Sequence, residues 1–293
     1  MIIQQIVNGL AIGTVYAIVA VGYSLVFGVL NMMNMAHASI FALGAHFIYT
    51  FGITLGLGEI PGLIISVLLT GIICVVYDKT ILAPLRKTEG GSGVVVLITG
   101  FGVQYFLLNM LMILWGSEYK AFPNIFNLGT ITIGGVGFDS TQLFMLLIAV
   151  ILLICLTLIV YKTKLGLGMR AIQQNAKAAK LMGVNVSRTI AATFFLSGVM
   201  AVVASFLVAS YYQLVYYTMG STLGTKAFAA AVLGGIGILH GSVVGGLLIG
   251  VAECITVYFF GGTYRDAVAF CVLILVLLFK PTGLFGKKVN VKV

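Results

Sequence analysis

The chain has 293 residues, of which 61% are hydrophobic and only 8% are charged. Water cannot dissolve a compact fold with so little polar surface, so this composition excludes a soluble enzyme or binding module and indicates an integral membrane protein. The net charge of +9 is expected to orient the chain in the bilayer rather than to bind nucleic acid.

Nine apolar runs follow one another along the chain, and short polar links separate them. The longer runs meet the need of a spanning helix for roughly 20 apolar residues. We therefore predict an all-α fold, a polytopic transmembrane bundle of eight or nine segments forming one domain over 1–293. Whether the short runs 223–239 and 266–279 cross fully is left open. The runs are 3–30, 35–55, 61–77, 94–115, 141–161, 190–212, 223–239, 242–260 and 266–279.

Most Lys and Arg residues fall into three groups, at 79–87, 162–188 and 280–292. An even number of runs separates each group from the next, so all three share one side of the membrane. Loops with an excess of Lys and Arg are cytoplasmic by the positive-inside rule. We therefore expect a cytoplasmic C-terminus and an N-terminus outside.

A polar interruption separates the first two runs. Asn31, Asn34 and His37 cluster there, at the predicted cytoplasmic end of a hairpin. These residues either cap helix ends or line a transport path or gate.

The cytoplasmic segment 162–189 contains a helical pattern. Polar residues recur on one face between Arg170 and Lys180, and a small apolar face carries Ile172, Ala176, Ala179 and Met182. Gly183 fits a helix C-cap, and Asn185 or Ser187 fits the N-cap of the next helix. A short helix of this kind suits either a groove on a cytoplasmic partner or an anionic lipid surface.

Glycines interrupt the chain between 234 and 241, where Gly235 and Gly237 make a continuous helix unfavourable. Broken helices at membrane depth are tolerated where they line a cavity. Glu253, the one deep charge that the pattern indicates, lies in the middle of the next run. It is either a pathway or gating residue, or a structural carboxylate that pairs with Lys226.

In order and spacing, these features resemble the permeases of branched-chain amino acid ABC importers, specifically the LivH-like subunit, from about Ile6 to Gly286. The matching stretches are 8–10, 13–17, 34–37, 170–185, 226–228, 231–237, 245–253 and 280–286.

The resemblance implies an alternating-access permease for leucine, isoleucine and valine in the bacterial inner membrane. Its implied partners are a paralogous LivM-like permease, two cytoplasmic ABC ATPases, an extracytoplasmic substrate-binding protein and membrane lipid. ATP hydrolysis would occur on the ATPases, because this chain has no GxxxxGK[ST] motif. We predict no catalytic residue, metal site, cofactor or nucleic-acid partner in this chain.

The family's coupling loop falls on residues 166–185. The predicted ATPase contact comprises Arg170, Ala171, Ala176, Ala179, Met182, Gly183 and Asn185. The pathway or gate candidates are Asn31, Asn34, His37, Gly235, Gly237 and Glu253.

The chain departs from the family pattern at Ala38, Ser39 and His240, and these differences leave the solute open. Urea, short amides or other amino acids are alternatives. An ion-coupled secondary carrier is a more distant one, because it would need more charges inside the membrane.

Overall fold

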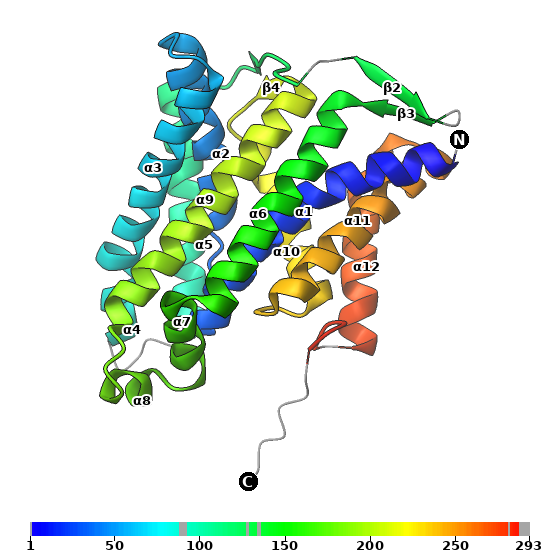
Figure 1. Ribbon diagram of the computed structural model, residues 1–293. Coiled ribbons are helices and arrows are strands. Elements are labelled where there is room, and N and C mark those ends of the chain that lie inside the picture. Colours follow the sequence, from blue (N-terminus) through cyan, green and yellow to red (C-terminus); the bar gives the residue numbers. More distant parts are fainter. Residues whose placement is uncertain (1, 88–92, 127–128, 134–135, 281, 287–293) are drawn as a thin grey trace.

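In the computed structural model the chain is a bundle of long helices, and residues 2–87, 93–126, 129–133, 136–280 and 282–286 are described (Figure 1). The helices are α1 (Ile2–Leu30), α2 (His37–Ile48), η1 (Tyr49–Thr54), α3 (Glu59–Tyr77), η2 (Asp78–Leu82), α4 (Ala83–Lys87), α5 (Gly93–Trp115), α6 (Ser140–Lys162), α7 (Lys164–Gln174), α8 (Ala176–Leu181), α9 (Val186–Tyr212), α10 (Met219–Gly234), α11 (Leu239–Phe260), η3 (Gly262–Tyr264) and α12 (Arg265–Phe279). The strands are β1 (Lys120–Ala121), β2 (Thr130–Ile133), β3 (Val136–Asp139) and β4 (Leu214–Val215).

Seven segments of the described chain are long and apolar enough to cross a membrane. They are α1, α3 with its extension through η2 and α4, α5, α6, α9, α11, and η3 with α12. The other two predicted runs form α2 with the π-helical turn η1, and α10. With 16 residues, α10 extends about 24 Å at 1.5 Å per residue, which is shorter than a hydrocarbon core of about 30 Å.

The two predicted interruptions are both real. The first link, residues 31–36, separates α1 from α2, and Asn31 ends α1 with a positive φ of 52°. The second link, residues 235–238, separates α10 from α11 and contains Gly235 and Gly237 with φ of 104° and 87°. Glycine adopts such backbone angles without a steric penalty, so the second break follows from the sequence.

Helix α1 lies at the centre of the bundle and packs most extensively on α11. Gly9 and Gly13 of α1 lie against the backbone of α11, while Gly246 and Gly250 of α11 lie against the backbone of α1. An added Cβ at any of these glycines would meet main-chain atoms of the other helix. Small residues spaced four apart allow helices to approach closely in lipid, and the predicted small-residue steps do this here.

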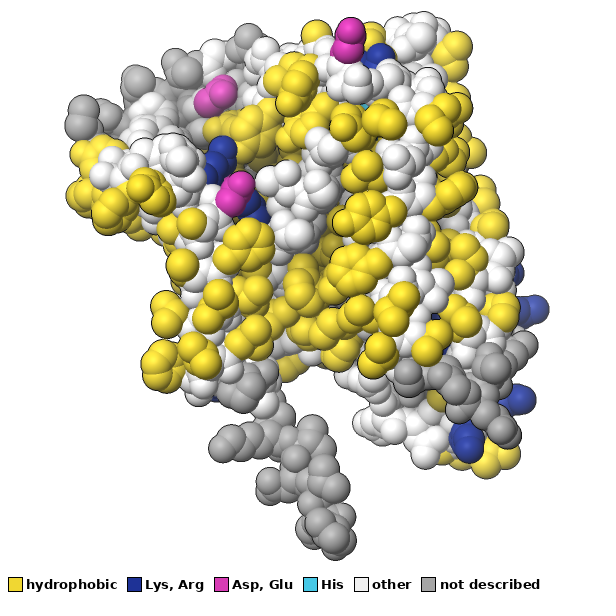
Figure 2. All heavy atoms as spheres, turned by 180° about the vertical axis from the view of Figure 1, so that it is seen from behind, with side chains coloured by type: hydrophobic (Ala, Val, Ile, Leu, Met, Phe, Trp, Pro, Cys, Tyr) yellow, Lys and Arg dark blue, Asp and Glu magenta, His cyan; other side chains and the backbone are white. Residues whose placement is uncertain are grey.

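The two short sheets are antiparallel, with β1 paired to β4 and β2 to β3. They lie at one end of the bundle, opposite the end formed by α4, α7 and α8 (Figure 1). We call the latter the basic end, because the cations of 79–87 and 162–188 belong to it. Between the two ends the surface is apolar, as Figure 2 shows for one face. Ile98, Phe106 and Ile113 of α5, for example, are 63–77% exposed, which fits a lipid-facing helix.

Candidate functional site

The segment from α6 to α9 is built from three capped helix starts. The Thr163 hydroxyl accepts a hydrogen bond from the Gly166 amide at the start of α7, at 3.2 Å. The Asn175 side chain accepts bonds from the amides of Lys177 and Ala178 at the start of α8, both at 3.0 Å. Asn185 accepts from the Arg188 amide at 3.1 Å and so caps α9. Each cap satisfies amides that a helix start leaves unpaired.

The prediction of one continuous helix in this segment is wrong, because Asn175 separates α7 from α8 in an extended conformation. Ala178 and Lys180 carbonyls accept bonds at the end of α8, and Gly183 follows with a φ of 86°, as expected for a residue just after a helix. The sequence therefore located both ends of this segment correctly and missed the break between them.

The predicted apolar face divides into an inner and an outer part. Ile172 and Ala179 are buried, whereas Met182 is 84% exposed. Leu181, next to Met182, is 89% exposed. Ala176 is exposed, and Ala171 packs partly against the core. The outward apolar group at the basic end is thus Leu181 and Met182, and Ala179 holds α8 to the protein.

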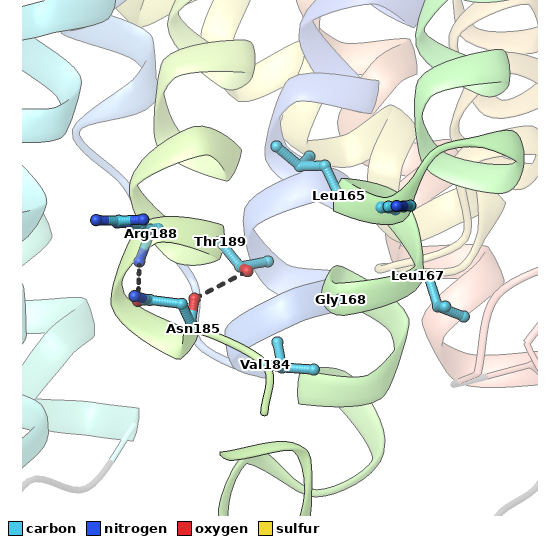
Figure 3. Close-up of a pocket in the computed structure, with 8 residues that line it drawn as sticks. Leu165, Leu167, Gly168, Val184, Asn185, Arg188 and Thr189 are labelled. Atoms are coloured by element: carbon cyan, nitrogen blue, oxygen red, sulfur yellow. Dashed lines mark hydrogen bonds between the residues drawn. The ribbon is translucent and has the colours of Figure 1, made fainter. Parts of the chain in front are cut away.

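Two hollows flank the link between α8 and α9. One, of about 320 Å³, is lined by α7 and the start of α9, and Figure 3 shows Leu165, Gly168, Val184 and Asn185 around it. The other, of about 580 Å³, lies between α8, α9 and the η2–α4 region. Its described lining includes four cations, Lys79, Arg86, Lys177 and Lys180, and one acid, Asp78, which pairs with Arg86 at 2.6 Å.

Arg170 faces the bundle rather than the outer surface of the segment. Its Nε atom is buried without a hydrogen-bond partner among the described residues, and its guanidinium carbon lies 5.6 Å from the centre of the Tyr161 ring. The Tyr161 ring lies parallel to that of His240 within 10°, with centres 5.5 Å apart. Arg170 also lines a narrow gap of about 40 Å³ with Ser24 of α1 and Gly237 of the second break. The structure therefore places Arg170, half-buried, beside the second break.

The asparagines of the first break stabilise helix ends. Asn31 ends α1, as described above, and Asn34 is buried. The Asn34 side-chain oxygen accepts bonds from the Ala36 amide at 3.2 Å and from the Tyr77 hydroxyl at 3.0 Å. These contacts hold the link between α1 and α2 in place and join it to α3.

His37 is the first residue of α2 and is buried at 1% exposure. Its Nδ1 lies 3.2 Å from the Ser197 hydroxyl of α9, and its ring centre lies 4.6 Å from that of Tyr23 in an edge-to-face arrangement. Gly22 of α1 makes room for the ring, because a Cβ there would lie 2.5 Å from Nε2. His37 thus connects α1, α2 and α9 at a point of very close packing.

The second break is closed by the turn after α12. The amides of Leu284 and Phe285 donate to the carbonyls of Leu233 and Gly234, at 2.8 and 3.2 Å. These carbonyls end α10 and would otherwise lack intrahelical partners. The turn also lies against Gly235, where a Cβ would approach Thr282 and Gly286. The chain's last described segment is therefore part of the break.

Glu253 is fully buried and forms the centre of an ion network. Its carboxylate accepts hydrogen bonds from the Tyr16 hydroxyl at 2.7 Å, from Lys226 Nζ at 3.0 Å and from Arg265 Nε. Lys226 also pairs with Asp266 at 2.6 Å. The network therefore joins α1, α10, α11 and the start of α12.

The expectation that Glu253 is the one deep charge is wrong, because Lys226 is only 4% exposed. The sequence analysis gave Lys226 as a partner but missed Tyr16, Arg265 and Asp266. The last two follow Glu253 by 12 and 13 positions across a pair of glycines, Gly261 and Gly262. The glycine pair indicates a helical hairpin, and a hairpin there would have brought Arg265 and Asp266 near Glu253. Figure 2 shows basic and acidic side chains together in a recess on this apolar face.

These features define a class: a polytopic helical membrane protein with broken helices, a buried ion network and a basic end that presents apolar side chains. Within it, the chain belongs to the branched-chain amino acid transport system permease component family, whose sequence profile matches residues 5–277.

Full-length relatives support this assignment. The chain is 36% identical to the high-affinity branched-chain amino acid transport system permease protein BraD of Pseudomonas aeruginosa, over 97% of this chain and 96% of the relative. It is 32% identical to the permease protein LivH of Escherichia coli, over the same shares. Among solved structures, PsaBC from Streptococcus pneumoniae in complex with Fab has a similar fold, with a TM-score of 0.50 and 17% identity over 94% of this chain and 91% of that one. The chain is thus a LivH-like permease and a multi-pass protein of the bacterial inner membrane type.

Proposed function

We propose that this chain is one permease subunit of an ATP-driven importer for leucine, isoleucine and valine, and that its basic end docks on a cytoplasmic ATPase. The observation that carries the proposal is the pair Leu181 and Met182, which project from the basic end with most of their surface exposed. Two apolar side chains at a helix end suit insertion into a groove on a partner, and the surrounding cations suit an acidic rim.

The proposed assembly contains this chain, a paralogous LivM-like permease, two ATPases and an extracytoplasmic binding protein. The family assignment supports these partners, because the family and its relatives are named as the permease component of a branched-chain amino acid transport system. The ATPases would hydrolyse ATP, and this chain would form half of the pathway as a single transmembrane domain.

Transport would proceed by alternating access. ATP-driven closure of the ATPases moves the docked α7–α8 segment, and the two states of the permease must bind the closed ATPases with different affinities. Gly183 ends α8, Asn185 caps the start of α9, and Arg170 lines the narrow gap beside Gly237 of the second break. Motion of α7 would therefore act on the second break at Gly237, which lies beside Arg170 and Gln173.

Candidate gate residues separate into two groups in this proposal. Gly235 and Gly237 supply a break that a small backbone change can open, and His37 fills a tight junction between helices. Asn34 and Glu253 hold the first link and the helices together, because their side-chain atoms already have described partners. Asn31 ends α1 through its backbone.

The ion network favours a second candidate, an ion-coupled carrier, since intramembrane charges are the hallmark of that class. In the described part of the chain, however, Glu253 pairs with both Lys226 and Arg265, and Lys226 also pairs with Asp266. The charges of the network therefore neutralise one another. A charge pair of this kind offers no free carboxylate to an entering cation, so the importer remains the favoured function.

The test is reconstitution in proteoliposomes with the paralogous permease, the ATPase subunits and the binding protein. We expect labelled leucine uptake that requires both ATP and the binding protein, and ATP hydrolysis that leucine stimulates. ATP hydrolysis without a leucine response would keep the assembly and redirect the search to urea, short amides or other amino acids. Leucine uptake by this chain alone, driven by an ion gradient, would establish the carrier instead.

A further inference from the structure

An open groove of about 430 Å³ lies between α6 and α11, whose ends approach one another near α7 (Figure 1). Six of its eight lining residues are aliphatic and two are polar. The lining consists of Val150, Leu153, Ile154, Thr157, Leu158, His240, Val243 and Val244. Because both helices cross the membrane, the groove opens at membrane depth, and its occupant must be apolar.

The groove has the length of a lipid chain within one leaflet. Its α6 side extends from Val150 to Leu158, and eight residues of helix rise about 12 Å. One leaflet contributes about 15 Å to the hydrocarbon core, half of its thickness. The α11 side of the groove begins at His240, the second residue of that helix. The groove therefore lies in the half of the membrane next to the basic end.

His240 and Arg170 lie at the basic end of the groove, both against the Tyr161 ring. His240 stacks on Tyr161, and the Arg170 guanidinium lies over the same ring, as described above. Arg170 forms no ion pair within the described part of the chain, although it is half-buried and its Nε is fully enclosed. Arginine at such a position is suited to a phosphate group, which can accept two of its N–H bonds at once.

The sequence around the groove contains cations and lacks acids. Residues 140–252, which include both walls of the groove, contain no Asp or Glu. Lys162 follows Tyr161 directly, and Lys164 begins α7 two positions later. A net positive mouth above an apolar channel attracts lipids with anionic headgroups more than zwitterionic ones.

We propose that this groove binds one acyl chain of an anionic phospholipid from the leaflet at the basic end, with the lipid phosphate at Arg170, Lys162 and Lys164. The bound lipid would fill the space between α6 and α11 and tie α7 to the start of α11. The proposal is independent of the transported solute.

The first experiment measures lipid retention by the purified full-length chain. Equal amounts of phosphatidylglycerol and phosphatidylcholine with identical acyl chains are added, and bound lipid is counted by native mass spectrometry. We expect at least tenfold preference for phosphatidylglycerol. Val243→Trp fills the groove and should reduce bound phosphatidylglycerol at least fivefold. The matched control Ile151→Trp places the same ring on the exposed face of α6 outside the groove, and should retain the lipid.

The headgroup contact is tested by charge removal. Arg170→Gln and Lys164→Gln should each abolish the preference for phosphatidylglycerol, while Lys180→Gln on α8 should not. If Arg170→Gln fails to fold, Lys164→Gln still tests the headgroup contact and Val243→Trp still tests the groove. Equal retention of the two lipids, or retention that Val243→Trp leaves unchanged, would overturn the proposal. A disulfide between Ile154→Cys and a second permease subunit in membranes would also overturn it, because the groove would then be covered by protein.

Discussion

At the scale of single residues, the carboxylate of Glu253 has the largest set of partners of any described acid. We predict that Glu253→Gln lowers the free energy of unfolding by about 3–5 kcal/mol, because Lys226 and Arg265 lose a buried anion. The matched control is Asp266→Asn, which removes the other partner of Lys226. Asp266 is 57% exposed, so its loss should cost about 1 kcal/mol or less. Thermal unfolding in detergent measures both.

A different result would change the role of Glu253. If the Gln variant assembles and unfolds like the parent but transports more slowly, the carboxylate acts on the pathway rather than on the packing. Uptake and unfolding measured on the same preparation separate these two outcomes.

Gly22 leads to a second prediction. A methyl group there would lie within 2.5 Å of the His37 ring, which is enclosed by Ser197 and Tyr23 and has little room to move. We expect Gly22→Ala to lower the unfolding midpoint in detergent. Gly102→Ala is the control, because Gly102 also lies within a helix but has open space around it. Alanine should stabilise that helix by roughly 0.5–1 kcal/mol. Equal midpoints for the two variants would show that the His37 junction is loosely packed.

The sequence predicted some of these residue contacts and not others. Pairing of Glu253 with Lys226 was an explicit alternative, because a deep carboxylate needs a partner. The Tyr16 hydroxyl carries no such signal, since a tyrosine in an apolar run is ordinary and its partner lies 237 positions away. The space that Gly22 provides for His37 is equally invisible before the helices are packed.

At the scale of elements, hydropathy predicted the helices well because each segment must satisfy its own backbone in lipid. Each of the nine apolar runs contains a helix, and the glycine break is where the sequence placed it. Asn185 caps α9, one of the two positions that the sequence offered. The division at Asn175 was missed because the side-chain pattern continues across it. Asparagine competes for backbone amides, and here it starts a new helix instead of extending the first.

The third prediction concerns the proposed docking surface at the end of α8. Because Ala179 is buried, an Asp at this position would disturb α8 itself and cannot test docking cleanly. The sharper change is Met182→Gln, which keeps the side-chain length and removes its apolar character. We expect it to reduce co-purification of the ATPase at least fivefold while the unfolding temperature of the permease stays unchanged. Met182→Leu, which preserves the apolar surface, should retain the ATPase. Equal recovery of the ATPase with both variants would remove Met182 from the proposed interface.

At the scale of the whole molecule, the two ends of the bundle differ in charge and in structure. The basic end carries the cations of 79–87 and 162–188, whereas the opposite end carries the two β-ribbons together with Glu59 and Glu118. α1 passes through the centre between them, and its close glycine contacts with α11 allow no rearrangement without separating the backbones. Any alternating motion should therefore occur around the α1–α11 pair rather than within it.

The same asymmetry gives the last prediction, the orientation in the membrane. Lys- and Arg-rich short loops stay on the cytoplasmic side, so the basic end should face the cytoplasm. In a variant with all four cysteines replaced by alanine, Ser187→Cys at the start of α9 and Ser117→Cys after α5 provide exposed labels at opposite ends. A membrane-impermeant maleimide should label position 117 in intact spheroplasts and position 187 only after permeabilisation. Ser205→Cys, fully buried in α9, controls for non-specific reaction. Labelling of position 187 from outside would reverse the topology and place Leu181 and Met182 beyond the reach of any cytoplasmic ATPase.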